Sequence, residues 1–160
     1  MSYTPDWCPY GCGDMNLRET RKDKRSRPLV VIESPYAGDV EANVAYAKRC
    51  VLDSLRRGEA PYASHLFFTQ PGLLDDLKPE ERRLGMESGF AWGEAASVVA
   101  VYIDRGLSSG MREGIVAAGR RGARIEVRAL DREVTTQMLE AVYELIKIRD
   151  TGSDERSETK

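Results

Sequence analysis

Short apolar runs alternate with longer amphipathic stretches through the middle of the chain. Residues 29–32 form a continuous apolar run after Pro28, as expected of a strand that is covered on both faces. Residues 97–103 and 125–128 have the pattern of further strands, and residues 60–63 can form a short one. Strands that alternate with helices in this way are typical of βαβ units on a parallel sheet.

The stretches between these runs carry helix signals. Asp39 can cap a helix that ends at Gly58, and apolar residues recur between them at helical spacing: Val40, Val44, Ala47, Val51 and Leu55. Further helices are predicted over residues 79–95, 109–120 and 133–149. Because parallel crossovers are right-handed in nearly all cases, the helices must cover both faces of an open, twisted sheet. The sequence therefore predicts an α/β fold in three layers, with four strands and four helices.

Length and charge narrow the picture further. A chain of 160 residues fits one domain with its own core. We expect this domain over residues 28–149, an irregular N-terminal arm over residues 1–27 and a disordered polar tail over residues 150–160. Lys and Arg number 24 against 26 Asp and Glu, a net charge of −2, so no overall field draws the protein to a polyanion. Nucleic acid is therefore not expected as the main partner.

The sequence also lacks the signals of export and of a metal centre. No apolar run approaches the roughly 20 residues that span a bilayer, and the N-terminus lacks the order of a signal peptide, so we expect a cytoplasmic protein without a membrane partner. Cys8 and Cys12 lie close together, but a zinc site needs about four ligands, and only Cys50 and His65 remain to complete the set. We therefore expect no metal and no cofactor.

Four polar segments lie at the carboxyl edge of the predicted sheet, which is where open parallel sheets bind ligands. The first three supply hydroxyl groups, a tyrosine ring for stacking, a glycine for close approach, a histidine and a carboxylate. Such residues are also common in ordinary turns and in packed cores. The candidate binding residues of these three segments are Ser34, Pro35, Tyr36, Gly38, His65 and Asp76.

The fourth segment, residues 102–114, runs from a strand into a Ser/Gly-rich turn and then into a helix. Unpaired amides and the partial positive charge of a helix N-terminus suit an anion such as phosphate. Neither a Walker loop nor a dinucleotide fingerprint is present. Asp104 offers a carboxylate at the strand end, and Glu113 lies in the first helical turn, where acidic residues also stabilise helices without a catalytic role. The candidate binding residues here are Arg105, Ser108, Ser109, Gly110 and Met111.

These segments resemble the nucleoside 2-deoxyribosyltransferase-like superfamily, especially its small phage and bacterial members of unassigned function. The matching pieces fall within residues 29–130 and are residues 32–39, 63–70, 101–111 and 125–128. The resemblance implies a flavodoxin-like (Rossmann-like) open parallel sheet of four to five strands and a pocket for a nucleoside or nucleotide. It also implies a homo-oligomer in which a neighbouring copy completes the site.

In catalytic members of the superfamily, a glutamate in the helix after the Ser/Gly turn attacks the anomeric carbon of the nucleoside. One carboxyl group is the nucleophile and a second group manages the proton, as in retaining glycosidases. This chain has Gly114 at the position expected for that glutamate, and Glu113 precedes it by one residue, a rotation of about 100° on a helix. The resemblance therefore implies Glu113 as nucleophile, with Asp104 or Tyr36 assisting departure of the base.

Three functions remain open from the sequence. The first is hydrolysis or transfer at the N-glycosidic bond of a (deoxy)nucleoside or its 5′-monophosphate. The second is a catalytically inactive pocket that binds a nucleotide, as a sensor or a sequestering protein. The third is an interaction protein whose contact surface is the basic run over residues 18–27.

Overall fold

Four parallel strands form the sheet of the computed structural model, which describes residues 27–147. The central strands are β1 (Leu29–Glu33) and β3 (Val98–Tyr102), and the edge strands are β2 (Ala60–Tyr62) and β4 (Arg124–Arg128). The strand order is β2-β1-β3-β4, and every neighbouring pair is parallel. The predicted open parallel sheet is confirmed.

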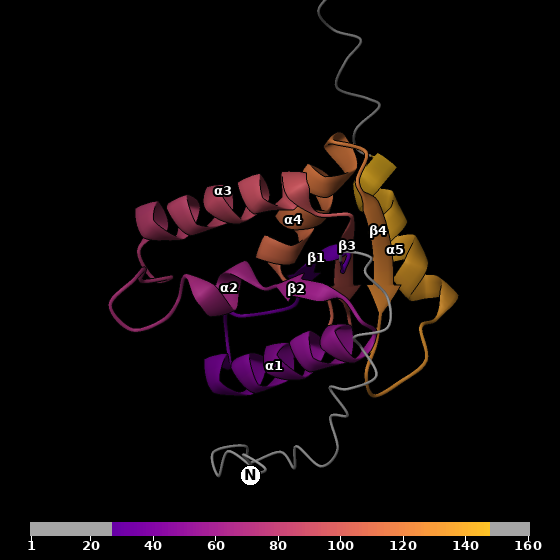
Figure 1. The fold of residues 1–160 in the computed structure, drawn as a ribbon, viewed down its shortest axis with the longest axis horizontal. Helices are drawn as coiled ribbons and strands as arrows, with labels where there is room; N and C mark the ends of the chain where they lie inside the picture. The colour runs from indigo at the N-terminus through magenta and orange to yellow at the C-terminus, as the bar shows by residue number, and fades with distance from the viewer. Residues whose placement is uncertain (1–26, 148–160) are drawn as a thin grey trace, which may run out of the picture.

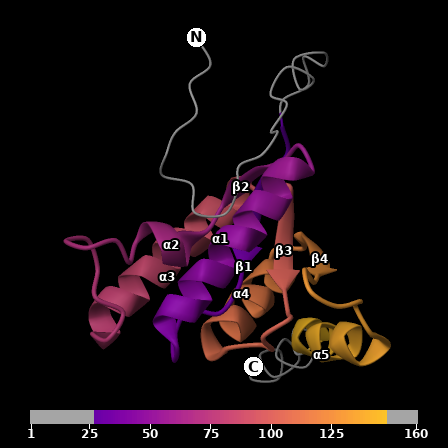
Figure 2. The ribbon, with the colours of Figure 1, turned by 90° about the horizontal axis from the view of Figure 1, so that it is seen from below.

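Helices lie on both faces of this sheet (Figure 1). Helix α1 (Val40–Arg56) covers one face, while α3 (Pro79–Ala95), α4 (Ser109–Arg120) and α5 (Thr136–Lys147) lie on the opposite side (Figures 1 and 2). The short helix α2 (Ser64–Phe67) directly follows β2. This arrangement is the three-layer α/β fold that the sequence predicts.

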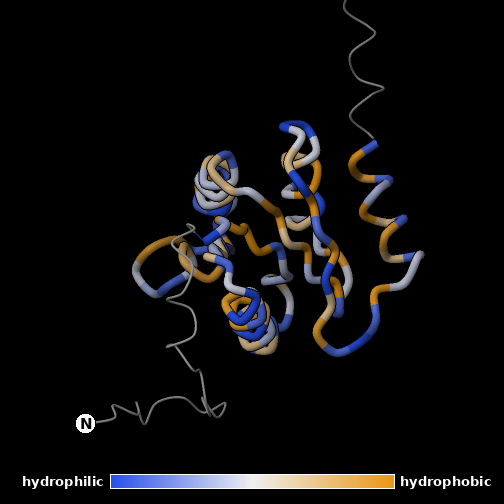
Figure 3. The backbone as a smooth tube through the Cα atoms, turned by 45° about the vertical axis from the view of Figure 1, so that its right-hand side comes forward, coloured by the Kyte–Doolittle hydropathy of each residue, from blue (hydrophilic) through white to orange (hydrophobic). Residues whose placement is uncertain are grey.

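The two faces of the central strands carry separate apolar cores. The side under α1 buries Val30, Ile32, Ala100 and Tyr102 of the sheet together with Tyr46 and Cys50 of the helix. The other side buries Val31, Val99 and Val101 together with Met111, Ile115 and Ala118 of α4 and Val142 of α5. Side chains alternate between the faces of a strand, so a strand that serves two cores is apolar at every position. Figure 3 shows these hydrophobic segments in the middle of the molecule.

The predicted helix ends are largely confirmed. Asp39 caps α1, with its Oδ1 atom accepting a hydrogen bond from the amide of Ala42 at 3.2 Å. Ser108 caps α4 in the same way, because its Oγ atom accepts a hydrogen bond from the amide of Met111 at 3.3 Å. Gly58 follows α1 with a φ angle of 81°, which favours glycine. The caps Asp39 and Ser108 fix where two loops at the carboxyl edge of the sheet end and their helices begin.

Two features differ from the predicted elements. Residues 64–67 form the helical turn α2, so the described part of the chain has five helices where four were expected. The last helix begins at Thr136 and not at residue 133, because Thr135 precedes it with its backbone oxygen accepting from Met138 and Leu139. The predicted end of this helix at residue 149 lies outside the described residues.

Several further expectations fall on parts of the chain that the structure does not describe. The N-terminal arm over residues 1–27, apart from its last residue, lies there, and so do Cys8, Cys12 and the polar tail over residues 150–160. Within residues 27–147, no helix is long and apolar enough to cross a membrane.

Candidate functional site

A pocket opens at the carboxyl edge of the sheet, where β1 ends and α4 begins. Its walls come from the β1–α1 loop, from α2, from the loop that follows α2, from α3 and from the first turn of α4. The cavity volume is about 100 Å³. Pockets that bury a whole drug-sized ligand usually enclose several hundred Å³, so this one has room for only part of such a ligand. The predicted residues that line it are Ser34, Tyr36, His65, Asp76, Ser108, Ser109, Gly110 and Met111.

A serine and a histidine form a hydrogen-bonded pair inside the pocket. The Oγ atom of Ser34 lies 2.8 Å from Nε2 of His65, and the direction of this bond depends on the tautomer of the ring. The ring of Tyr36 meets the imidazole edge-on, with centroids 6.4 Å apart. Burial lowers the pKa of His65 to about 4. The imidazole is therefore neutral at pH 7, with one nitrogen that donates and one that accepts a hydrogen bond. These nitrogens can bind Ser34 or a ligand.

Glu33, the last residue of β1, brings a carboxyl group into the same pocket. It shares a face of the strand with Val31, which packs towards α4. Its carboxyl group lies against the bare backbone of Gly114: a Cβ atom built on this glycine would stand 2.7 Å from Cδ of Glu33 and closer still to Oε1. Burial raises the pKa of Glu33 to about 8, although the positive charge of Arg121 acts in the opposite direction. The carboxyl group is therefore mostly protonated at neutral pH.

The N-terminus of α4 forms another wall of the pocket. The Oγ atom of Ser108 accepts a hydrogen bond from the amide of Met111. The amides of Ser109 and Gly110 have no acceptor within the described part of the chain. An arginine of α3 reaches this end, since a Cβ atom on Gly110 would stand 3.2 Å from Nη2 of Arg82. Free amides and a guanidinium group together favour an anion.

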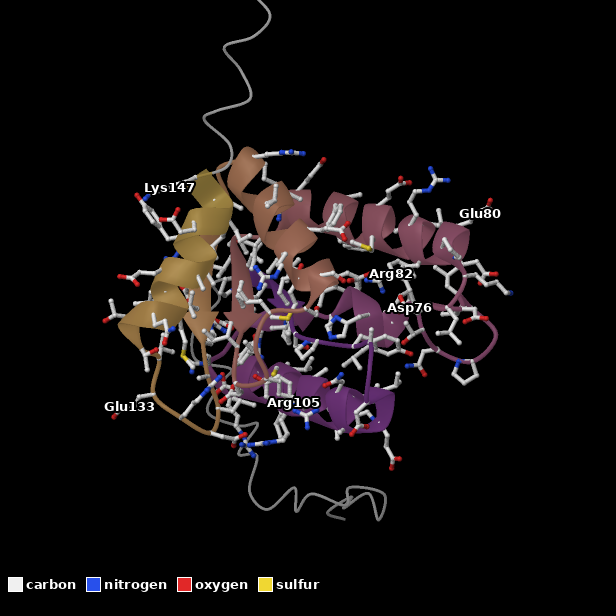
Figure 4. All side chains as sticks on the ribbon, turned by 180° about the vertical axis from the view of Figure 1, so that it is seen from behind. Asp76, Glu80, Arg82, Arg105, Glu133 and Lys147 are labelled. Carbon is white, nitrogen blue, oxygen red and sulfur yellow. The ribbon has the colours of Figure 1, made fainter. Side chains whose placement is uncertain are left out.

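Asp76 holds that arginine in place. Nη1 of Arg82 donates to both carboxylate oxygens of Asp76, at 2.7 and 2.8 Å. Figure 4 shows the two side chains next to each other, while Arg105 lies apart from them towards α1. Asp76 therefore orients a cation at the pocket wall.

Helix α3 approaches the pocket through glycines. A Cβ atom on Gly89 would stand 2.9 Å from Oγ of Ser64, and one on Gly85 would stand 3.3 Å from a methyl group of Leu74. Any side chain at Gly89 would push α2 away from α3. The close packing of these two helices places His65 and Ser64 beside the pocket.

Asp104 has a different environment from the one expected. Its carboxylate accepts hydrogen bonds from the Tyr46 hydroxyl at 2.5 Å and from the amides of Leu130 and Asp131 at 2.9 to 3.0 Å. Burial alone would raise the pKa of Asp104, but these donors hold it below its usual value. Asp104 ties the loop after β4 to α1, and it does not line the pocket.

Three other predicted residues also lie away from the pocket lining. Arg105 donates to Oδ1 of Asn43 at 2.7 Å and stacks over the ring of Tyr46. Gly38 provides a turn with a φ angle of 94° before α1. The lining residues do not include Pro35 either.

Glu113 faces another hollow, between α3 and α4. The residues around it there include Phe90, Arg112, Arg120 and Arg121. Gly114, the next residue, is buried and faces Glu33. The rotation of one helical position thus separates Glu113 from the pocket, and its assignment as nucleophile stays a prediction.

The sequence interpretation missed most residues of the α3 wall. Their signal was the recurrence of glycine every four residues at Gly85, Gly89 and Gly93, which marks a helix face that another element approaches closely. The α3 residues missed in this way are Glu81, Arg82, Gly85, Met86, Gly89 and Phe90. The other lining residues that were missed are Val31, Glu33, Ala37, Ser64, Phe68, Thr69 and Leu74. No group of three or more potential metal ligands is present among the described residues.

An open parallel sheet with helices on both faces and a pocket at its carboxyl edge defines a three-layer α/β protein of the flavodoxin type. The model of a family named only as a domain of unknown function, DUF7768, matches residues 28–128, and the chain belongs to this family. Among curated proteins, none matches the chain.

One solved structure with a similar fold is a 2-deoxyribosyltransferase from the psychrotolerant bacterium Bacillus psychrosaccharolyticus, described as a biocatalyst for the synthesis of nucleosides. The two chains are 11% identical with a TM-score of 0.50, and the match covers 76% of this chain and 90% of that chain. At this level of identity the likeness shows a common fold.

Proposed function

We propose that the pocket binds a nucleoside or a nucleotide and cleaves or transfers its N-glycosidic bond. The observation that carries the proposal is the convergence in one hollow of the Ser34–His65 pair, the Tyr36 ring and the N-terminus of α4. These groups offer a neutral hydrogen-bonding ring, an aromatic surface for a base or sugar, and a place for an anion. The fold likeness to a 2-deoxyribosyltransferase supports the same chemical class.

The proposal assigns the two ends of the ligand to different walls. The sugar lies between β1 and α2, next to the Ser34 hydroxyl and the imidazole of His65. A 5′-phosphate, where present, meets the amides of Ser109 and Gly110 and the guanidinium group of Arg82. Since the cavity encloses only part of such a ligand, the proposal includes a cytoplasmic homo-oligomer in which a second copy closes the mouth.

A binding protein without turnover is the second candidate. The specific observation in its favour is the lack of a side chain at Gly114, with Glu113 turned into the other hollow. Such a protein would hold a nucleotide through the same walls and release no base.

Incubation with a mixture of nucleosides and 5′-monophosphates separates the two candidates. Release of free base, followed by chromatography, supports the enzyme. A rise in melting temperature with a nucleotide but without released base supports the binding protein. If no base is released and no nucleotide raises the melting temperature, both candidates are overturned.

The phosphate end has its own test. Arg82→Gln should lower the affinity for monophosphates at least tenfold more than the affinity for nucleosides, because a charged hydrogen-bond donor is lost beside the α4 amides. The rise in melting temperature at several ligand concentrations measures both affinities. Arg83→Gln, a charge change at an exposed position of the same helix, is the matched control. Equal weakening of both ligand types by Arg82→Gln would contradict this placement.

A further inference from the structure

The place of the missing side chain on α4 is already filled. Gly114 is buried, and the space where its Cβ atom would stand is taken by the carboxyl group of Glu33, with Cδ at 2.7 Å and Oε2 at 2.9 Å. Any residue larger than glycine at position 114 would have to displace this carboxyl group. The two positions are therefore complementary, because α4 has no side chain at Gly114 where β1 places the carboxyl group of Glu33.

Glu33 also differs from the other carboxyl groups of the pocket. Asp76 accepts two hydrogen bonds from Arg82, and Glu81 accepts from Lys78 and from the amide of Asp75. Within residues 27–147, the carboxyl group of Glu33 has neither a hydrogen bond nor an ion pair. It is thus the pocket carboxyl group that remains available to a ligand.

We infer that Glu33 is the catalytic carboxyl group of the site, presented from β1 into the space that Gly114 leaves on α4. The inference rests on the proposed cleavage of an N-glycosidic bond. It names a residue of the strand, and not one of the helix, as the group that contacts the reacting atoms.

The carboxyl group acts as a general acid. Its proton moves to a nitrogen of the departing base, and the C1′–N bond breaks with both electrons going to the base. A water molecule from the open mouth adds to C1′ and loses a proton, which restores the protonated Glu33. The sum is nucleoside plus water giving free base plus sugar. Burial, which raises the pKa of Glu33 to about 8, keeps the acid form present at neutral pH.

Few charged groups face Glu33 from the surrounding elements. Arg121 at the end of α4 lowers its pKa. On the α2 side stands His65, which is neutral at pH 7. On the α3 side Arg82 is bound to Asp76, and Glu81 is bound to Lys78. The protonation of Glu33 therefore depends mainly on burial.

A double-mutant cycle tests the contact between Glu33 and Gly114 without any ligand. Its four proteins are the wild type, Glu33→Ala, Gly114→Ala and the double variant. In the Glu33→Ala background, Gly114→Ala should raise the melting temperature by about 3 °C or more, because alanine is the better helix former and the collision is gone. In the wild type the same substitution should lower the melting temperature. The same shift in both backgrounds would overturn the contact on which the inference depends.

Base release tests the catalytic role. Glu33→Gln should lower the rate at least ~100-fold, the usual contribution of a general acid, whereas Glu140→Gln at an exposed position of α5 should leave it unchanged. The double variant Glu33→Ala/Gly114→Glu, which moves the carboxyl group to the helix, should release base at least ~10-fold faster than Glu33→Ala. The wild-type rate should fall as the pH rises through about 8, as the acid is lost.

The outcomes separate the two proposals. A wild type that releases base, together with an equally active Glu33→Gln variant, would overturn the role of Glu33 and leave the proposed function standing. A wild type that releases no base from any nucleoside or monophosphate would overturn both. A rate that rises as the pH passes through 8 would overturn the acid role.

Discussion

Two carboxyl groups at the carboxyl edge of the sheet, one after each central strand, have opposite environments. Asp104 follows β3 and accepts hydrogen bonds from a tyrosine hydroxyl and two backbone amides, which keep its pKa low. Glu33 ends β1. Its carboxyl group has no hydrogen bond within the described residues, and burial raises the pKa of this group to about 8. Position at the edge is therefore not enough to assign a role, because the supply of donors decides whether a carboxylate stabilises the fold or stays available.

Removal of the Asp104 carboxylate should have the largest effect on stability. We expect Asp104→Ala to lower the free energy of unfolding by about 3 kcal/mol at pH 7, because the Tyr46 hydroxyl and the amides of Leu130 and Asp131 lose a charged acceptor. Urea denaturation measures this loss.

The same pair of proteins should converge in acid. The pKa of Asp104 is lower in the folded state than in the unfolded chain, so its contribution is present above the unfolded pKa and is lost as the pH falls. A difference below 1 kcal/mol at pH 7, or one that grows in acid, would mean that these hydrogen bonds to Asp104 do not stabilise the folded state.

The pH dependence of stability should have the opposite sign for Glu33. The pKa of Glu33 is about 8 in the folded state, and the ordinary value of a glutamate is 4.5, so between these pH values the folded state binds more protons and stability falls as the pH rises. We expect the ionisation of Glu33 to lower the free energy of unfolding by about 2 kcal/mol between pH 6 and pH 8, near the limit of ~1.4 kcal/mol per pH unit for one proton. Glu33→Gln should flatten that part of the curve, and denaturation at several pH values measures it. Parallel curves for both proteins would show that Glu33 titrates in the ordinary range.

The residue next to Glu33 should give a smaller effect. Ser34→Ala removes the hydroxyl partner of His65 Nε2 and should lower the free energy of unfolding by about 1 kcal/mol in urea denaturation. Because His65 is the only histidine of the chain, its ring signals in NMR can be followed directly, and in the wild type they should titrate near pH 4. A midpoint near the usual value of 6.5 would place the ring in water and away from the pocket.

The smallest effect should come from the exposed pair beside Asp104. Arg49 binds the side chain of Asp131 at the surface, where the pair is about half exposed on each side. Arg49→Ala should lower the free energy of unfolding by less than about 0.5 kcal/mol, and added salt should remove the difference. A loss as large as that of Asp104→Ala would mean that Arg49 contributes as much as Asp104 to holding the loop after β4.

The fold was predictable because its signals are local. The apolar runs of the central strands, the caps Asp39 and Ser108 and the stop at Gly58 each depend on a few neighbouring residues. The apolar residues of α1 gave a less accurate picture of its buried face. Val40 and Leu55 are exposed, while Asn43 and Ser54 are buried.

Those two polar residues are buried because they have partners that the sequence does not reveal. Asn43 donates to the backbone oxygens of Tyr36 and Ala37, and Ser54 donates to Glu59. The pairing of Glu33 with Gly114 was hidden for the same reason, since it joins a strand end to a helix far away in the sequence. The sequence could locate the edge of the sheet where the pocket lies, but only the packing shows which carboxyl group enters it.

The two outer strands set how copies of this protein can meet. Strand β2 has three residues, and its middle residue is Pro61, which has no N–H group to offer a further strand. Strand β4 carries the charged residues Arg124, Glu126 and Arg128. Short, proline-bearing and charged edge strands discourage strand addition, so we expect any assembly of copies to use helices and loops and not to lengthen the sheet.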